Sequence, residues 1–169
     1  DRYQFILPYY NFNKYFKSQF NDGEINFSSS GSNNLNNTNE LKSRIDNNIN
    51  YQSNKMISGM GIVNQFNIYL KNTNTIGKKS NSLKSSPDIE LWNLNEYSAE
   101  LPLIKLSKNF NNFITPKISL RFNPTDMKDH SGSSRGIGIN NLFSINRLAI
   151  NDSFEEGGSL TAGITYKKK

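Results

Sequence analysis

Apolar and polar residues alternate along several long stretches of this chain. Between residues 41 and 51, one parity mixes apolar residues with a serine and an asparagine. The other parity is entirely charged or amide: Lys42, Arg44, Asp46, Asn48 and Asn50. Residues 114–122 repeat the pattern, with Ile114, Pro116, Ile118, Leu120 and Phe122 set against Thr115, Lys117, Ser119 and Arg121. Because successive side chains of a strand point to opposite faces, both stretches are predicted to be strands with one apolar and one polar face.

The segment 141–166 predicts two further long strands joined by a polar turn. In residues 142–150 the two parities both carry apolar side chains, with Arg147 on one of them. In residues 159–166, Leu160, Ala162, Ile164 and Tyr166 share one face, and the opposite face is made of serine, threonine and glycine. Between them, residues 151–158 are rich in the Asn, Asp, Ser and Gly that turns require.

The rest of the chain predicts more strands and three long polar loops. Strands are expected over 3–10, 12–20, 24–30, 57–72 and 89–106, and loops over 31–40, 73–88 and 123–136. Pro8 is expected at a bulge, a strand end or a sheet edge, because proline donates no ladder hydrogen bond. Pro102 is expected to interrupt its strand, and the Asp-Gly pair at 22–23 predicts a hairpin turn. The spacing of Phe12, Phe16 and Phe20 also fits a helix face, but the asparagine and aromatic content favours a strand.

Long strands with one polar and one apolar face are typical of a transmembrane β-barrel. A spanning strand needs about 9–11 residues, touches lipid with every second side chain and turns the others to the lumen. The fold class is predicted to be all-β, and the pattern fits an antiparallel transmembrane β-barrel segment that forms an incomplete barrel. Periodicity alone slightly favours a soluble antiparallel sandwich or a β-solenoid, because the barrel signal of each strand is weak.

Composition narrows the classes of function. Hydrophobic residues make up 34% of the chain and aromatic residues 12%, and the net charge is +6. Without cysteine, neither a disulfide framework nor a cysteine metal site can form within the chain. The basic residues are scattered, and no fingerprint of a nucleic-acid-binding fold is present, so nucleic acid is not an expected partner. The chain begins without Met and within strand-like sequence, so residues 1–169 are expected to be a fragment of one larger barrel domain.

The residues that could carry chemistry do not form a catalytic pattern. His130 is the only histidine, and a lone loop histidine has no second histidine or cysteine with which to bind a metal. The serine- and glycine-rich run 131–138 precedes a predicted strand rather than a helix, which argues against a phosphate cradle. Glu155 and Glu156 are expected to be solvated turn charges. We therefore expect no catalytic, metal-binding or cofactor-binding residues and no enzyme activity.

Three segments resemble, in order, the barrel of the lipopolysaccharide-assembly outer-membrane proteins of the LptD family. They are 101–106 (LPLIKL), 114–124 (ITPKISLRFNP) and 140–166. The family has a Pro-Leu strand, a Thr-Pro or Glu-Pro strand, a loop, and an Asn-Leu-Phe segment that ends in Asn-Arg and an acidic turn. The matching residues are Pro102, Leu103, Thr115, Pro116, Asn141, Leu142, Phe143, Asn146, Arg147, Asp152, Glu155 and Gly158. Residues 6–12 are similar to an earlier Leu-Pro strand, so the resemblance extends over the whole chain.

The resemblance favours the transmembrane β-barrel segment over the soluble folds. It also implies a role in moving lipopolysaccharide into the outer leaflet of the outer membrane of a Gram-negative bacterium. The implied partners are lipopolysaccharide, outer-membrane lipid, a plug lipoprotein and periplasmic bridge proteins. Five basic residues would then line the lumen and attract lipid phosphates: Lys42, Arg44, Lys117, Arg121 and Arg147. Solvation of an interior wall is an equal explanation for them. A porin-like channel and a secreted β-rich adhesin remain alternative functions.

Overall fold

The computed structural model describes residues 4–19, 22–36, 39–107, 110–129, 136–148 and 154–169. These residues form nine strands: β1 (Gln4–Lys17), β2 (Glu24–Asn36), β3 (Glu40–Gln52), β4 (Met56–Ile57), β5 (Val63–Lys78), β6 (Asp88–Glu100), β7 (Leu103–Leu106), β8 (Asn111–Asn123) and β9 (Gly157–Lys168). The all-β prediction is therefore confirmed. Within the described parts of the chain, no helix has the length and apolar character needed to cross a membrane.

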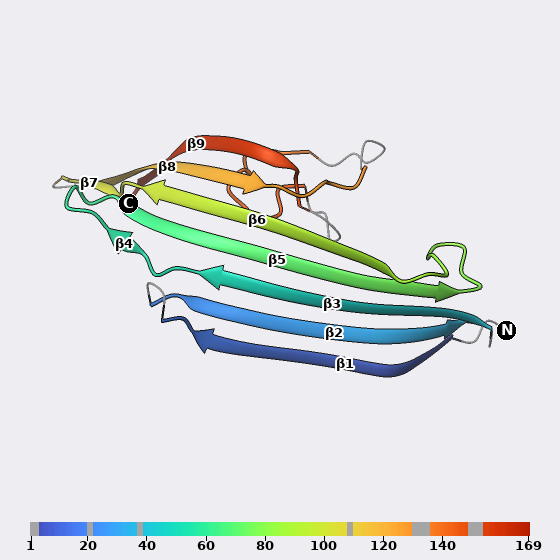
Figure 1. The fold of residues 1–169 in the computed structure, drawn as a ribbon. Helices are drawn as coiled ribbons and strands as arrows, with labels where there is room; N and C mark the ends of the chain where they lie inside the picture. The colour runs from blue at the N-terminus through green and yellow to red at the C-terminus, as the bar shows by residue number, and fades with distance from the viewer. Residues whose placement is uncertain (1–3, 20–21, 37–38, 108–109, 130–135, 149–153) are drawn as a thin grey trace.

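All the strands belong to one antiparallel sheet (Figure 1). Strands β3 and β4 both pair with β5, and β6 and β7 both pair with β8, so each of these pairs acts as one interrupted strand. The chain thus runs as an up-and-down meander from β1 to β9. Among the described strands, β1 pairs only with β2 and β9 only with β8, which leaves the sheet open at both edges.

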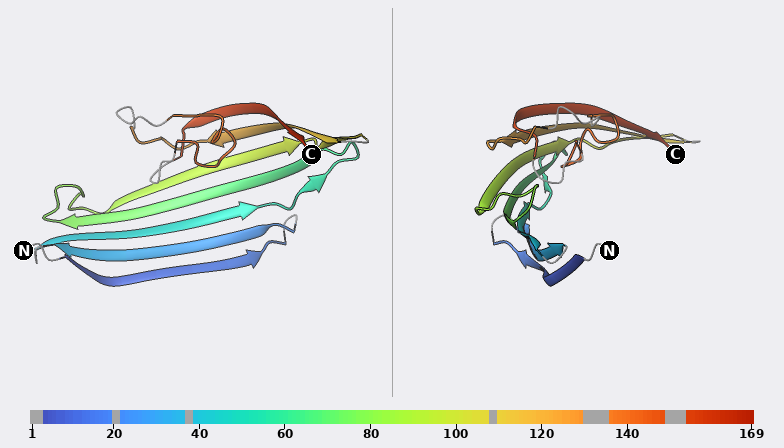
Figure 2. Two further views of the ribbon diagram at one scale, coloured as in Figure 1. Left: turned by 180° about the vertical axis from the view of Figure 1, so that it is seen from behind. Right: turned by 90° about the vertical axis from the view of Figure 1, so that its right-hand side faces the viewer.

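The sheet is curved, and the connection between β8 and β9 lies within the curve (Figure 2). We call the face that this connection covers the inward face and the other the outward face. Paired residues of neighbouring strands point to the same face, so the register assigns every strand residue to one of them. Ser119, Arg121 and Thr161 are buried beneath the connection and therefore belong to the inward face.

Several predicted strands are found close to their expected positions. Strand β3 covers the alternating stretch 41–51, and β8 covers 114–122. Pro8 lies where the register between β1 and β2 shifts by one residue, on an edge strand, so its predicted bulge is confirmed. The break at Leu101 and Pro102 separates β6 from β7, as expected. Asp22 has a positive φ of 47° and lies in the connection between β1 and β2, where the hairpin turn was predicted.

Other predicted boundaries are wrong. The loop expected over 31–40 is largely strand, because β2 continues to Asn36 and pairs there with both β1 and β3. The loop expected over 73–88 is shorter, because β5 continues to Lys78. The strand expected over 57–72 is broken by a turn at 58–62. The stretches 3–10 and 12–20 do not form two strands; their described parts give one, β1.

The first strand predicted in 141–166 does not form over its described residues, 141–148, which belong to the connection between β8 and β9. In its described part, the Asn141 side chain accepts from the Gly138 N–H at 2.6 Å and donates to the Gly136 carbonyl at 3.0 Å. The Ser144 N–H donates to the Asn141 carbonyl. These local bonds satisfy the backbone groups that a strand would have paired with a neighbour. His130, Asp152 and most of the run 131–138 lie outside the described residues.

Candidate functional site

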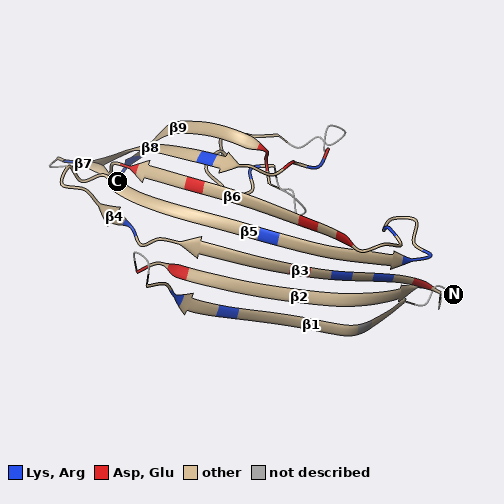
Figure 3. Ribbon diagram, viewed as in Figure 1, with Lys and Arg blue, Asp and Glu red and all other residues tan. Residues whose placement is uncertain are grey.

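The inward face of the sheet is polar, and the register places most of the charges of the strands on it. Figure 3 marks the positions of these charged residues along the strands. On β3 the inward residues are Glu40, Lys42, Arg44, Asp46, Asn48, Asn50 and Gln52. On β6 they include Asp88, Glu90, Glu96 and Glu100, and on β8 Lys117, Ser119 and Arg121. The inward residues of β9 opposite β8 include Ser159 and Thr161. This face can interact with polar or charged groups along the full length of the strands.

The connection 124–156 is attached to this face through a shared carboxylate. Glu155 accepts from Nε of Arg147 at 2.7 Å and from its second terminal nitrogen at 3.1 Å. The same carboxylate accepts from Nη1 of Arg121 on β8 at 3.2 Å. The side chains of Arg121 and Arg147 are only 4% and 8% exposed, so both cations depend on this anion for charge compensation. We call Arg121, Arg147 and Glu155 the clamp.

Further hydrogen bonds hold the clamp to both strands. Arg147 donates to the Ser159 hydroxyl at 2.9 Å and to the Thr161 hydroxyl at 3.1 Å, both on β9. Arg121 donates to the carbonyl oxygen of Ile145. At the end of β8, the amide of Asn123 donates to the carbonyls of Phe154 and Glu155 at 3.2 and 2.9 Å. The connection therefore forms one bonded unit with β8 and β9.

A more deeply buried carboxylate, Glu96, lies next to the clamp on β6. Its oxygens accept from the Ser119 hydroxyl at 2.8 Å and from the Asn67 amide at 3.2 Å. Glu96 is the register partner of both Asn67 and Arg121. The residue is 7% exposed, and charged groups this buried are normally paired. Glu96 therefore extends the polar network from the clamp to β5 and β6.

The connection also contacts the sheet through aromatic residues. The ring of Phe154 lies 6.4 Å from that of Tyr69 on β5. Phe143 lies beneath the ammonium group of Lys117, whose nitrogen is 5.1 Å from the ring centroid. The connection therefore spans the inward face from β9 to β5.

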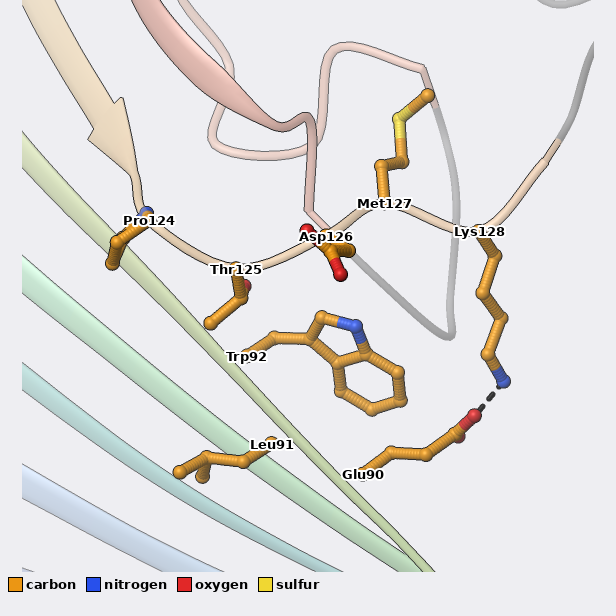
Figure 4. A pocket seen from close by; sticks show the side chains of 8 residues that line it. All are labelled: Glu90, Leu91, Trp92, Pro124, Thr125, Asp126, Met127 and Lys128. Atoms are coloured by element: carbon orange, nitrogen blue, oxygen red, sulfur yellow. Dashed lines mark hydrogen bonds and ion pairs between the residues drawn. The ribbon is translucent and has the colours of Figure 1, made fainter.

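An open cavity of about 470 Å³ lies where the connection leaves β8 (Figure 4). Its lining comes from β6, through Glu90, Leu91 and Trp92, and from residues 124–128. Lys128 bonds Glu90 at 2.8 Å, and its nitrogen lies 5.3 Å from the Trp92 ring centroid. Lys71 of β5 approaches the same ring at 5.9 Å. Because Trp92 is only 4% exposed and is flanked by two lysines, it anchors the connection and presents no open ring face to a ligand.

The five basic residues predicted to line a lumen do not form one cluster. Arg121 and Arg147 meet in the clamp, and Lys117 reaches Phe143 nearby. Arg147 comes from the connection, so its expected place in a strand is wrong. Lys42 and Arg44 lie farther along β3, where Lys42 contacts Glu40 at 3.0 Å and Arg44 contacts Asp46 at 2.6 Å. The hydrogen bond from Lys42 lowers the pKa of the Glu40 carboxyl group.

Sequence reasoning missed the acidic half of this site. Glu155 was expected to be a solvated turn charge, but it is the anion that joins two buried arginines. Glu96 has the parity of the inward face, and that parity was the signal that could have identified it. In the described part of the chain, no group of three His, Asp or Glu residues is arranged to hold a metal ion.

No protein-family model matches the chain, and no curated protein sequence matches it.

Proposed function

We propose that this chain is a segment of an outer-membrane β-barrel of the LptD type, which inserts lipopolysaccharide into the outer leaflet of a Gram-negative outer membrane. The observation that carries the proposal is the contrast between the two faces of the sheet. The polar inward face would line the lumen, and the outward face would contact lipid.

The outward face supports this placement by its lack of charge. Between its ends, β8 presents Ile114, Pro116, Ile118, Leu120 and Phe122, of which the isoleucines, Leu120 and Phe122 are 40–56% exposed. On β9 the outward residues include Leu160, Ile164 and Tyr166, which are 61–74% exposed. The outward charged residues of the described strands are Lys14, Lys78, Lys105 and Lys168, and the last three lie at strand ends. A soluble protein rarely leaves so large an apolar face uncovered.

The connections between strands differ at the two ends of the sheet. At one end they are short: 18–23, 58–62 and 107–110. At the other end the turn 37–39 is joined by the longer connections 79–87 and 124–156. Outer-membrane barrels have short periplasmic turns and longer extracellular loops. In the proposed barrel, the long connections lie on the extracellular side, together with the clamp that attaches one of them to the sheet.

In the proposed barrel, the connection between β8 and β9 would occupy part of the lumen next to these two strands. Substrate would move past fixed charges on β3, β6 and β8, and no residue would need to make or break a covalent bond. The polar groups would instead bind and release the sugar and phosphate groups of lipopolysaccharide by exchange of hydrogen bonds. A plug lipoprotein and periplasmic bridge proteins would be partners of such a barrel.

Depletion in the cell tests the proposal. The protein should migrate as a heat-modifiable β-rich species, and its depletion should lower the lipopolysaccharide accessible to an impermeant surface label. Depletion of an unrelated outer-membrane barrel provides the matched control. Barrel behaviour with unchanged surface lipopolysaccharide would instead support a porin-like channel, and ion conductance would then be the next measurement. A lipid-indifferent soluble protein would contradict both.

A further inference from the structure

A row of polar side chains crosses the outward face of β2, β3 and β5. Ser29, Asn47 and Asn72 are register partners on these strands. The Ser29 hydroxyl donates to Oδ1 of Asn47 at 2.7 Å, and the Asn47 amide donates to Oδ1 of Asn72 at 3.1 Å. Tyr10 extends the row at one end through a 3.2 Å contact between hydroxyls, and Asn74 donates to Asn72 at 2.6 Å. We call Ser29, Asn47 and Asn72 the amide row.

The outward residues differ on the two sides of the amide row. Toward the end of the sheet with the short turns they are apolar except for Asn64 near the start of β5: Ile25, Phe27, Ile49, Tyr51, Phe66, Ile68 and Leu70. Toward the other end they include Gly31, Asn33, Ser43 and Asn74. Ile45 and Ile76 occur there as single apolar residues between polar neighbours, and Leu35 and Leu41 are register partners near the far ends of β2 and β3, beside Phe5 of β1. Single apolar residues and small apolar groups are ordinary for a water-exposed surface. The amide row therefore marks a boundary in surface chemistry.

The apolar surface crosses the strands obliquely. Ile25, Tyr51, Ile68, Asn95 and Phe122 are register partners and define one line across the sheet. On β2 and β3 the next apolar residues, Phe27 and Ile49, lie on the side of this line that faces the amide row. On β8 the apolar run through Leu120 and Ile118 lies on the opposite side. Strands of outer-membrane barrels are tilted by about 35–45°, so a band parallel to the membrane crosses them obliquely, as this apolar surface does.

We propose that the hydrocarbon of the outer membrane ends at the amide row. The apolar band on the side of the short turns contacts acyl chains, and the parts of β2, β3 and β5 beyond the row project into water. This inference rests on the proposed membrane function. Amides with remaining hydrogen-bond capacity are costly in hydrocarbon, whereas headgroups and water at the interface satisfy them.

Two isoleucines on one strand provide a matched test. Ile45 and Ile49 lie on the outward face of β3, on either side of Asn47, and they are 42% and 41% exposed. Residues 1–169 contain no cysteine, so once any cysteine elsewhere in the protein is replaced by serine, the single variants Ile45→Cys and Ile49→Cys can each carry one spin label. The variants are made in the protein as the cell produces it and are reconstituted in vesicles of phosphatidylethanolamine and phosphatidylglycerol. Ile118→Cys on β8 tests whether the apolar band runs obliquely across the sheet. Asn48→Cys is the comparison on the inward face of β3, where no contact with lipid is expected.

Collision of the label with oxygen and with a water-soluble nickel chelate measures its depth. The ratio of oxygen to chelate collisions should be several-fold higher at positions 49 and 118 than at position 45. If positions 45 and 49 give the same oxygen-rich ratio in an inserted protein, the boundary at the amide row is wrong and the membrane function stands. If the labels at positions 45, 49 and 118 all collide mainly with the chelate, and the protein does not bind to the vesicles, the proposed function fails. The boundary then fails with it.

Discussion

The ring of Phe143 lies directly over Gly163, so that a β-carbon added to Gly163 would stand 2.9 Å from Cε2 of the ring and 3.1 Å from Cζ. Phe143 belongs to the connection between β8 and β9, and Gly163 belongs to β9. The close approach requires the absence of a side chain at position 163. It is a second attachment of the connection, separate from the clamp, and it depends on shape rather than charge.

Gly163→Val should displace Phe143 and loosen the connection. Overpacking of this kind costs about 1–3 kcal/mol in the free energy of unfolding. The measurable effect is several-fold faster trypsin cleavage after Arg147, which is buried in the native chain. Phe143→Ala added to the same variant should restore much of the protection, because it removes the atoms that clash. Equal cleavage of the single and double variants would contradict the assigned contact.

Glu155→Gln should destabilise the protein strongly, because it leaves two buried arginines without their shared anion. Loss of one partner of a buried ion pair costs about 3–5 kcal/mol. Urea unfolding in vesicles or detergent, followed by the heat-modifiable shift, measures the change. Glu156→Gln is the matched control, since Glu156 accepts only a 3.3 Å exposed hydrogen bond from the Met127 N–H. Similar losses in the two variants would show that the clamp is not the source.

Glu96→Gln and Ser119→Ala should each weaken the network at β6. Ser119→Ala leaves one oxygen of a buried carboxylate without its donor, at a cost of about 1–3 kcal/mol in the free energy of unfolding. Glu100→Gln provides the comparison on the same strand and face. Its contact with Lys55 is 3.8 Å long and largely exposed, so a change of at most about 1 kcal/mol is expected. An effect at position 100 as large as that at position 96 would rule out burial as the cause.

Lys79→Gly should stabilise the turn after β5. Lys79 has a positive φ of 54°, a conformation that costs a side-chain-bearing residue more than glycine. Relief of about 1–2 kcal/mol of left-handed strain, less about 0.5–1 kcal/mol for the flexibility of glycine in the unfolded chain, gives an expected gain of about 0.5–1 kcal/mol in the free energy of unfolding. Lys78→Gly, at the last residue of β5, where φ is not positive, should instead destabilise by about 0.5–1 kcal/mol. If both changes shift the unfolding midpoint in the same direction, the backbone explanation is incorrect.

The regular strands could be predicted because their side-chain pattern agrees with their environment. In β8 every second residue of 114–122 is apolar and outward, so alternation located the strand within a few residues. The same holds for β3, where the inward parity is entirely polar. The inward assignment of Arg121 and Lys117 followed from the same parity.

The errors occurred where partners distant in sequence determine the structure. Residues 31–36 are serine, asparagine and glycine for the most part, which have low strand propensity, yet they pair on both sides with β1 and β3. Residues 142–148 alternate like a strand but have no neighbouring strand to pair with. Their conformation is stabilised instead by local hydrogen bonds of Asn141 and by the ion pair between Arg147 and Glu155. The periodicity of a single sequence reveals neither the neighbouring strands of a segment nor a charged partner elsewhere in the chain.

The clamp also has a consequence for the order of folding. Arg121, Arg147, Glu155, Ser159 and Thr161 all lie within residues 121–161, so their contacts need no distant part of the chain. Closing such a short loop costs less chain entropy than bringing remote strands together. The hairpin of β8 and β9 therefore acquires its inner filling from its own connection. In the proposed barrel, the remaining strands would enclose a segment already in place, and no chain would have to be threaded into a finished interior.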